Sequence, residues 1–131
     1  MGRTIFVALL PLLLFTSGAP AQRRAKAPDL EVVTVKAQRA PGQVHLDCKI
    51  RVTGQKPITG LVLSFDFLTD ENRVVTTQTA EAEEPYLEPG EESEMRVALN
   101  DPVRAVGIRV NAFDKNKREL SIGRNGPFPI D

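Results

Sequence analysis

A strict alternation of apolar and polar residues over 43–52 constrains the fold of this 131-residue chain more than any other feature. The side chains of a β-strand point alternately to opposite faces, so this pattern predicts a strand with one buried and one solvated face. The apolar positions of this stretch are Val44, Leu46, Cys48, Ile50 and Val52.

The same period of two recurs along the chain. It predicts strands over 61–68, 94–99 and 106–113, and weaker patterns predict strands over 30–37, 73–79 and 119–122. Turn-forming Gly, Pro, Asn and Asp separate these segments, and no segment after residue 21 has an apolar stripe at helical spacing. About seven short strands of this kind predict an all-β fold, a single antiparallel β-sandwich that is immunoglobulin-like in outline. Besides the apolar residues of 43–52, we expect a core built from Leu61, Leu63, Phe65, Phe67, Met95, Val97, Leu99, Val106, Ile108, Val110 and Ala112.

The first 21 residues differ from the rest of the chain. Arg3 is their only charge, an apolar run follows over 5–15, and small residues precede and include Ala21. This is the layout of a secretory signal peptide that is cleaved after Ala21. A membrane anchor is the alternative, but the run is shorter than the roughly 20 residues that a spanning helix needs, and Pro11 interrupts it.

The chain is thus expected to have three parts: a signal peptide (1–21), a flexible basic leader (22–28) and a β-sandwich domain (29–131). Lys and Arg number 17, as do Asp and Glu, so no global field attracts nucleic acid or a membrane. We expect no stable membrane insertion once the signal peptide is removed. The one cysteine allows no internal disulfide, and an exported domain without disulfides favours a bacterial envelope, in the periplasm or outside the cell.

Catalytic motifs are missing from the sequence. His45 and Cys48 lie three residues apart, on opposite faces of the predicted strand, and cannot form a nucleophile–base pair there. Neither Ser64, Ser93 nor Ser121 lies in a G-x-S-x-G elbow, and no G-x-G-x-x-G loop occurs. We expect a solvated His45 and a buried, unreactive Cys48, with an intermolecular disulfide as the alternative for Cys48. The chain is predicted to be non-enzymatic, with no cofactor and no metal site.

A glutamate-rich segment, 81–94, is the most unusual local feature of the sequence. Pro89-Gly90 predicts a type II turn in it, with Tyr86 and Leu87 packed beneath the turn. Charge at such a place also protects an edge strand against pairing with another chain. We interpret the segment as a surface that binds a basic protein partner in the envelope, with Glu83, Glu84, Tyr86, Glu91 and Glu92 as candidate interaction residues.

Two ligand-binding alternatives stay open at this point. Calcium prefers six to eight oxygen ligands, although this segment lacks the alternating Asp/Asn/Gly spacing of ordered calcium loops. The carboxylates available for calcium are Glu83, Glu84, Glu91 and Glu92, with Asp70 and Glu71 as additions. An envelope glycan would stack on exposed aromatic rings, for which Phe113, Phe128 and Tyr86 are the candidates.

Three segments together resemble the FxLYD domain family. They are "VHLDCKIRVTGQKPITGLVLSFDFLTDENRVV" over 44–75, "LEPGEESEMRVAL" over 87–99 and "AVGIRVNAF" over 105–113. The resemblance implies a small exported bacterial β-sandwich of poorly known function, and it carries over no catalytic residue. The chain departs from the family where the aromatic-Asp pair before the turn becomes "FLTD" (67–70), and where an Asn-rich turn becomes "TGQKPITG" (53–60).

Overall fold

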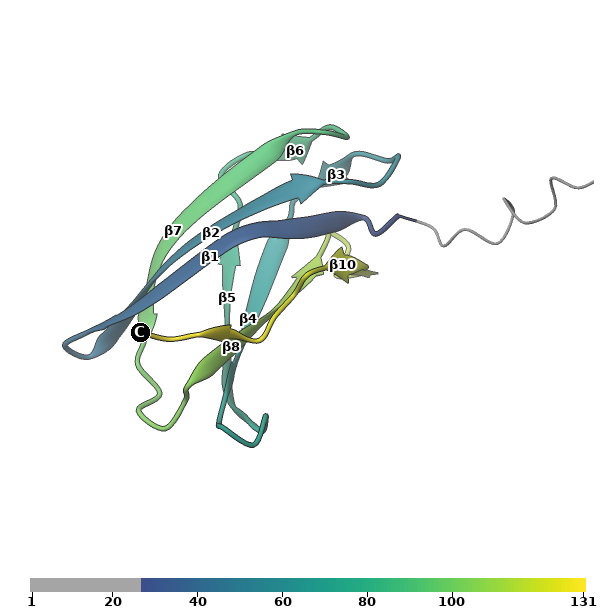
Figure 1. The fold of residues 1–131 in the computed structure, drawn as a ribbon. Coiled ribbons are helices and arrows are strands. Elements are labelled where there is room, and N and C mark those ends of the chain that lie inside the picture. The colour runs from purple at the N-terminus through teal and green to yellow at the C-terminus, as the bar shows by residue number, and fades with distance from the viewer. Residues whose placement is uncertain (1–26) are drawn as a thin grey trace, which may run out of the picture.

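The computed structural model describes residues 27–131, so the predicted signal peptide and residues 22–26 of the predicted leader lie outside the described residues. The described chain holds no helix, and its strands form an all-β sandwich, as predicted (Figure 1). One main sheet has the strand order β10-β1-β2-β7. Its strands are β1 (Leu30–Ala40), β2 (Gln43–Val52), β7 (Glu92–Asn100) and β10 (Ile122–Gly123).

The second main sheet has the order β11-β8-β4-β5, with β9 paired to β8. Its strands are β4 (Val62–Leu68), β5 (Val74–Glu81), β8 (Gly107–Phe113), β9 (Glu119–Leu120) and β11 (Phe128–Pro129). A short two-stranded sheet pairs β3 (Ile58–Thr59) with β6 (Tyr86–Leu87). The sandwich is antiparallel as predicted, and among the described strands only the short pair of β1 and β10 runs parallel.

The alternation over 43–52 has the predicted effect. Every apolar residue of β2 is at most 2% exposed, while its polar residues face outward. The preceding turn is tighter than the sequence indicated, because β1 continues to Ala40 and only Pro41 and Gly42 link it to β2. Gly42 has a φ of 74°, a conformation that costs glycine little.

The core lies between the two main sheets and contains nearly all of the predicted residues. Phe65 and Phe67 of β4 are fully buried at its centre, together with Ile108 and Val110 of β8. The prediction is wrong for Val106, which is 49% exposed. It lies one residue before β8, so the alternation of buried and exposed side chains within that strand does not extend to it.

The short strands differ most from the sequence prediction. The single strand expected over 119–122 is two strands, β9 and β10, which belong to different main sheets. The pairs that include β3, β6 and β11 were not predicted. Each strand there has two residues, too few for a periodic pattern, and its partner lies far away in the sequence.

Candidate functional site

The glutamate-rich segment runs from the end of β5 through β6 into β7, and a tight turn organises it. The N–H of Glu91 donates to the carbonyl of Glu88 at 3.0 Å, and Gly90 has a φ of 90°, so the predicted turn is present. Glu91 Oε1 also accepts from the Glu88 N–H at 2.7 Å. Leu87 is buried as expected, whereas Tyr86 is 48% exposed; it does not pack under the turn, and its exposure agrees with its place among the candidate interaction residues.

The five candidate residues fall into two groups. Glu84 accepts a 2.6 Å hydrogen bond from Ser93 Oγ, which belongs to a residue that is only 2% exposed. Together with Glu91 in the turn and Glu92 in the ion pairs described next, it is committed to contacts within the chain. Glu83 is exposed and Tyr86 is half-exposed. Only the second group is free to contact a partner without first breaking a contact of the fold.

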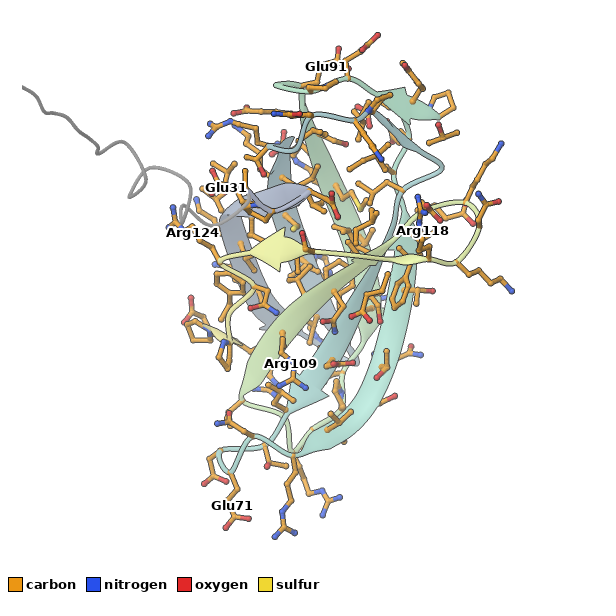
Figure 2. The ribbon with its side chains drawn as sticks, turned by 90° about the vertical axis from the view of Figure 1, so that its right-hand side faces the viewer. Glu31, Glu71, Glu91, Arg109, Arg118 and Arg124 are labelled. Atoms are coloured by element: carbon orange, nitrogen blue, oxygen red, sulfur yellow. The ribbon has the colours of Figure 1, made fainter. Side chains whose placement is uncertain are left out.

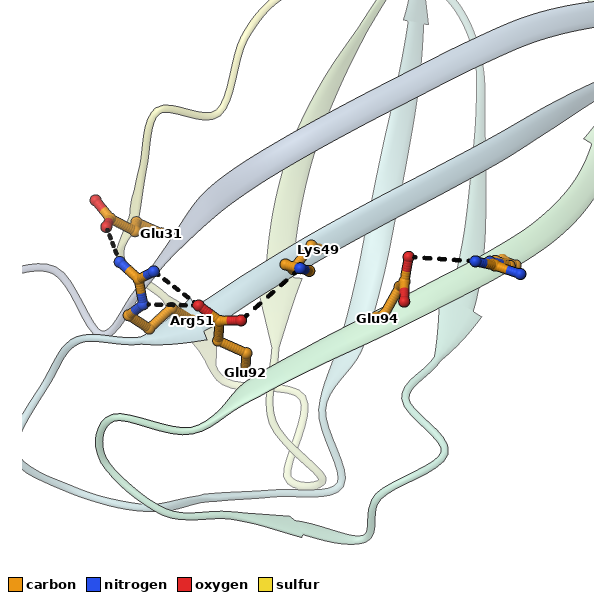
Figure 3. A network of polar contacts seen from close by, with 6 residues as sticks. Glu31, Lys49, Arg51, Glu92 and Glu94 are labelled. Atoms are coloured by element: carbon orange, nitrogen blue, oxygen red, sulfur yellow. Dashed lines mark hydrogen bonds and ion pairs between the residues drawn. The ribbon is translucent and has the colours of Figure 1, made fainter.

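An ionic ladder occupies the outer face of the β10-β1-β2-β7 sheet (Figure 3). Arg51 lies 2.7 Å from Glu92 and 3.4 Å from Glu31, so it joins β1, β2 and β7. Further along, Arg96 lies 3.2 Å from Asp47 and 3.8 Å from Glu94 on its own strand. Exposed ion pairs each contribute at most about 1 kcal/mol to stability. The ladder therefore balances charge across this face more than it stabilises the fold.

A second polar cluster, which the sequence did not single out, lies on the outer face of the other main sheet (Figure 2). Asp66 stands on the central strand β4, with Thr77 opposite it on β5 and Arg109 opposite it on β8. Its Oδ1 accepts from Thr77 Oγ1 at 2.7 Å. Its Oδ2 accepts from Asn111 Nδ2 at 3.0 Å and from Arg109 Nη2 at 3.3 Å. The Asp66 side chain is only 15% exposed, so three donors on two strands satisfy a largely buried carboxylate.

The hydrogen bonds of Asp66 predict that changing this residue destabilises the fold. The change Asp66→Asn keeps the side chain's shape but turns an amide NH₂ toward donors, and we expect it to lower the free energy of unfolding by about 1–3 kcal/mol. Chemical denaturation of both proteins measures the difference. Asp70→Asn, on the exposed turn after β4, removes the same charge and should change stability by less than about 0.5 kcal/mol. Equal effects of the two substitutions would show that the cluster does not stabilise the sheet.

The calcium alternative requires carboxylates that the fold keeps apart. Asp70 and Glu71 belong to the turn between β4 and β5, and Figure 2 shows Glu71 at the opposite end of the sandwich from Glu91. Across residues 27–131, no group of three or more His, Cys, Asp and Glu side chains is placed to hold a metal ion. The six carboxylates proposed as ligands therefore do not form one site.

The aromatic rings of the glycan alternative are also dispersed. Phe113 ends β8, while Phe128 on β11 pairs with Ile108 near the start of β8, and Tyr86 belongs to β6. Phe113 and Phe128 are partly buried. The three rings thus form no common platform on which a sugar chain would stack.

The two reactive side chains lie as the alternation predicted. Cys48 is 1% exposed in the core, and His45 is exposed on the outer face of the same strand. His45 borders an open hollow of about 570 Å³ together with Lys36 and Arg96. The geometry keeps His45 away from Cys48, so they make no catalytic pair. Residues 27–131 contain no helix that could span a membrane.

Comparison with known proteins gives only distant similarities. No protein-family model matches the chain, and neither does any curated protein. The chain is similar to a provisionally named ApaA protein from Bordetella pertussis, with 19% identity over 79% of this chain and 100% of that chain, and a TM-score of 0.44. It is also similar to a β-glucosidase from Kluyveromyces marxianus, with 14% identity over 74% of this chain but 13% of that one, and a TM-score of 0.38. At these levels of similarity, neither structure bears on the function of this chain.

Proposed function

We propose that this chain is an exported, non-enzymatic β-sandwich that works as a protein-interaction module of the bacterial envelope. The signal-peptide pattern over 1–21 and the resemblance to the FxLYD family support export. The separation of the two reactive side chains of β2, which form no nucleophile–base pair, supports a binding role over a catalytic one.

The observation that carries this proposal is that three acidic side chains close to the exposed Tyr86 in the sequence have no partner within the fold. Within residues 27–131, the carboxylates of Glu81, Glu83 and Glu88 have no ion pair or hydrogen bond, and Tyr86 between them is 48% exposed. Tyrosine is enriched at protein interfaces, where its ring supplies contact area and its hydroxyl a hydrogen bond. Uncompensated negative charge around it attracts a basic surface and speeds its encounter. We call these four residues the acidic patch.

A site-specific photo-crosslink tests the acidic patch as a docking surface. The photoreactive amino acid p-benzoylphenylalanine replaces Tyr86 in the chain expressed in its native host, and ultraviolet light then traps whatever contacts this position. We expect a discrete crosslinked protein from position 86. The matched control carries the same amino acid at Val103, which is 82% exposed in the loop after β7, away from the turn where β7 begins.

The charge dependence of the crosslink separates docking from chance encounter. Glu81→Gln, Glu83→Gln and Glu88→Gln combined should abolish the crosslink, because the attraction to a basic partner is lost. These three residues are chosen because Glu84, Glu91 and Glu92 have contacts within the fold, so changing them would also affect stability. The same product from Val103, or a product that survives the triple change, would contradict the proposal.

A further inference from the structure

The β7 strand forms an open edge of its sheet, because the strand order β10-β1-β2-β7 ends there. The Val52 N–H donates to the Glu91 carbonyl at 2.9 Å. In an antiparallel pair, hydrogen-bonded and non-hydrogen-bonded positions alternate, so the odd-numbered residues from Glu91 onward bond to β2. The even-numbered residues point their N–H and C=O groups away from β2. These residues are Glu92, Glu94, Arg96 and Ala98.

An independent contact at the end of β7 confirms that the even-numbered residues direct their backbone groups away from β2. Asn100 is the next even-numbered residue, and its N–H and C=O both bond to the side-chain amide of Gln78, at 3.0 and 2.9 Å. The Gln78 amide thus takes the place of a neighbouring strand at this single position. Along 92–98, no residue of the described chain bonds to the outward backbone groups. Such a row of free donors and acceptors is a template for another strand.

The side chains of this edge identify the strand that fits it. We propose that a second copy of the chain pairs its own β7 antiparallel to this one, about a two-fold axis at Met95. Glu94 of each copy then lies opposite Arg96 of the other, which gives two equivalent pairs of opposite charge. An interface of this kind is self-complementary, as two-fold symmetry requires. The outward backbone groups of both strands meet in the same register.

The neighbouring registers are disfavoured by charge and by the faces on which the side chains lie. Moving the axis by one residue places Arg96 opposite Arg96, or Glu94 opposite Glu94, and like charges directly opposite each other destabilise a sheet. Registers between these bring side chains of the buried face opposite side chains of the solvated face. The chosen register also covers Val97, a partly buried core residue at the edge, with the β7 of the second copy. The charges of β7 thus disfavour pairing with an arbitrary strand but favour pairing with the β7 of a second copy.

Charge reversal on separate copies tests this pairing. Glu94→Lys places a lysine opposite Arg96 of an identical copy, and Arg96→Glu places a glutamate opposite Glu94. Each variant alone should self-associate at least about tenfold more weakly than the wild-type protein. In an equimolar mixture, the introduced lysine of one variant faces the introduced glutamate of the other, and Arg96 again faces Glu94, so the mixture should recover the dimer. Sedimentation velocity over a dilution series of the exported chain measures all four samples.

The mixture also controls for folding. Any loss of stability from broken contacts with Asp47 or between residues 94 and 96 is the same in a variant alone and in the mixture, so it cannot produce recovery. Glu31→Lys reverses a charge on the same outer face but on β1, and should leave self-association unchanged. The triple change in the acidic patch should leave it unchanged as well. A wild-type protein that stays monomeric up to millimolar concentration, or a mixture no more associated than its parts, would overturn the proposal.

Discussion

Replacing Phe65 with alanine is expected to lower the free energy of unfolding by about 3–5 kcal/mol. Phe65 is 0% exposed and stands in the middle of β4, between Gln78 on β5 and Val110 on β8. Its ring fills the space between the two main sheets, and close-packed surroundings collapse only partly into the cavity that alanine leaves. Urea denaturation of the two proteins, monitored by circular dichroism, measures the loss.

The matched control for this substitution is Val74→Ala. Val74 also lies in the β11-β8-β4-β5 sheet but is 51% exposed, so its truncation should change stability by no more than about 0.5 kcal/mol. A loss below about 1 kcal/mol for Phe65→Ala would mean that the ring is not packed in the core as described.

Alkaline pH is expected to destabilise the protein through Cys48. Burial raises the pKa of this thiol from 9.0 to about 12. The unfolded chain therefore ionises the thiol above pH 9 while the folded chain keeps it neutral. The contribution of the Cys48 thiol to the free energy of unfolding is fully present below pH 9. It is lost as the pH rises toward 12, at about 1.4 kcal/mol for each pH unit. Between about pH 8 and 11 the loss from this group amounts to about 2–3 kcal/mol.

The substitution Cys48→Ala isolates this effect from the other groups that titrate at high pH. The variant should be less stable than the wild-type protein at about pH 8, because it lacks a buried sulfur, but the difference should shrink or reverse by about pH 11. The measurement is the free energy of unfolding of both proteins at each pH. Parallel curves would show that the thiol ionises as readily in the folded chain as in the unfolded one.

Local alternation explains why the long strands were predictable. In β2 and β4 the apolar residues recur every second position, and burial of one sheet face requires no knowledge of the partner strand. The same rule placed Cys48 in the core and His45 on the surface. It was wrong at Val106, because alternation continues in the sequence for one residue beyond the point where the backbone leaves the strand.

The functional interpretation of the glutamates depended on contacts that alternation does not contain. From the sequence alone, the same candidate role was predicted for Glu83, Glu84, Glu91 and Glu92. The fold brings Ser93 to Glu84 and Arg51 to Glu92, and it folds Glu91 back onto its own turn. Of these four carboxylates, only Glu83 makes no hydrogen bond or ion pair within residues 27–131. The other three contact residues that chain reversal and strand pairing bring close to them.

The class of fold, the faces of the long strands and the turn at Pro89-Gly90 can be predicted from the sequence, since they follow from local periodicity and backbone conformation. The contacts of Asp66 with Arg109 and Asn111, and the position of β7 at a sheet edge, could not be predicted in this way. Both depend on which strands are neighbours and in what register, and these are set by packing between segments far apart in the chain.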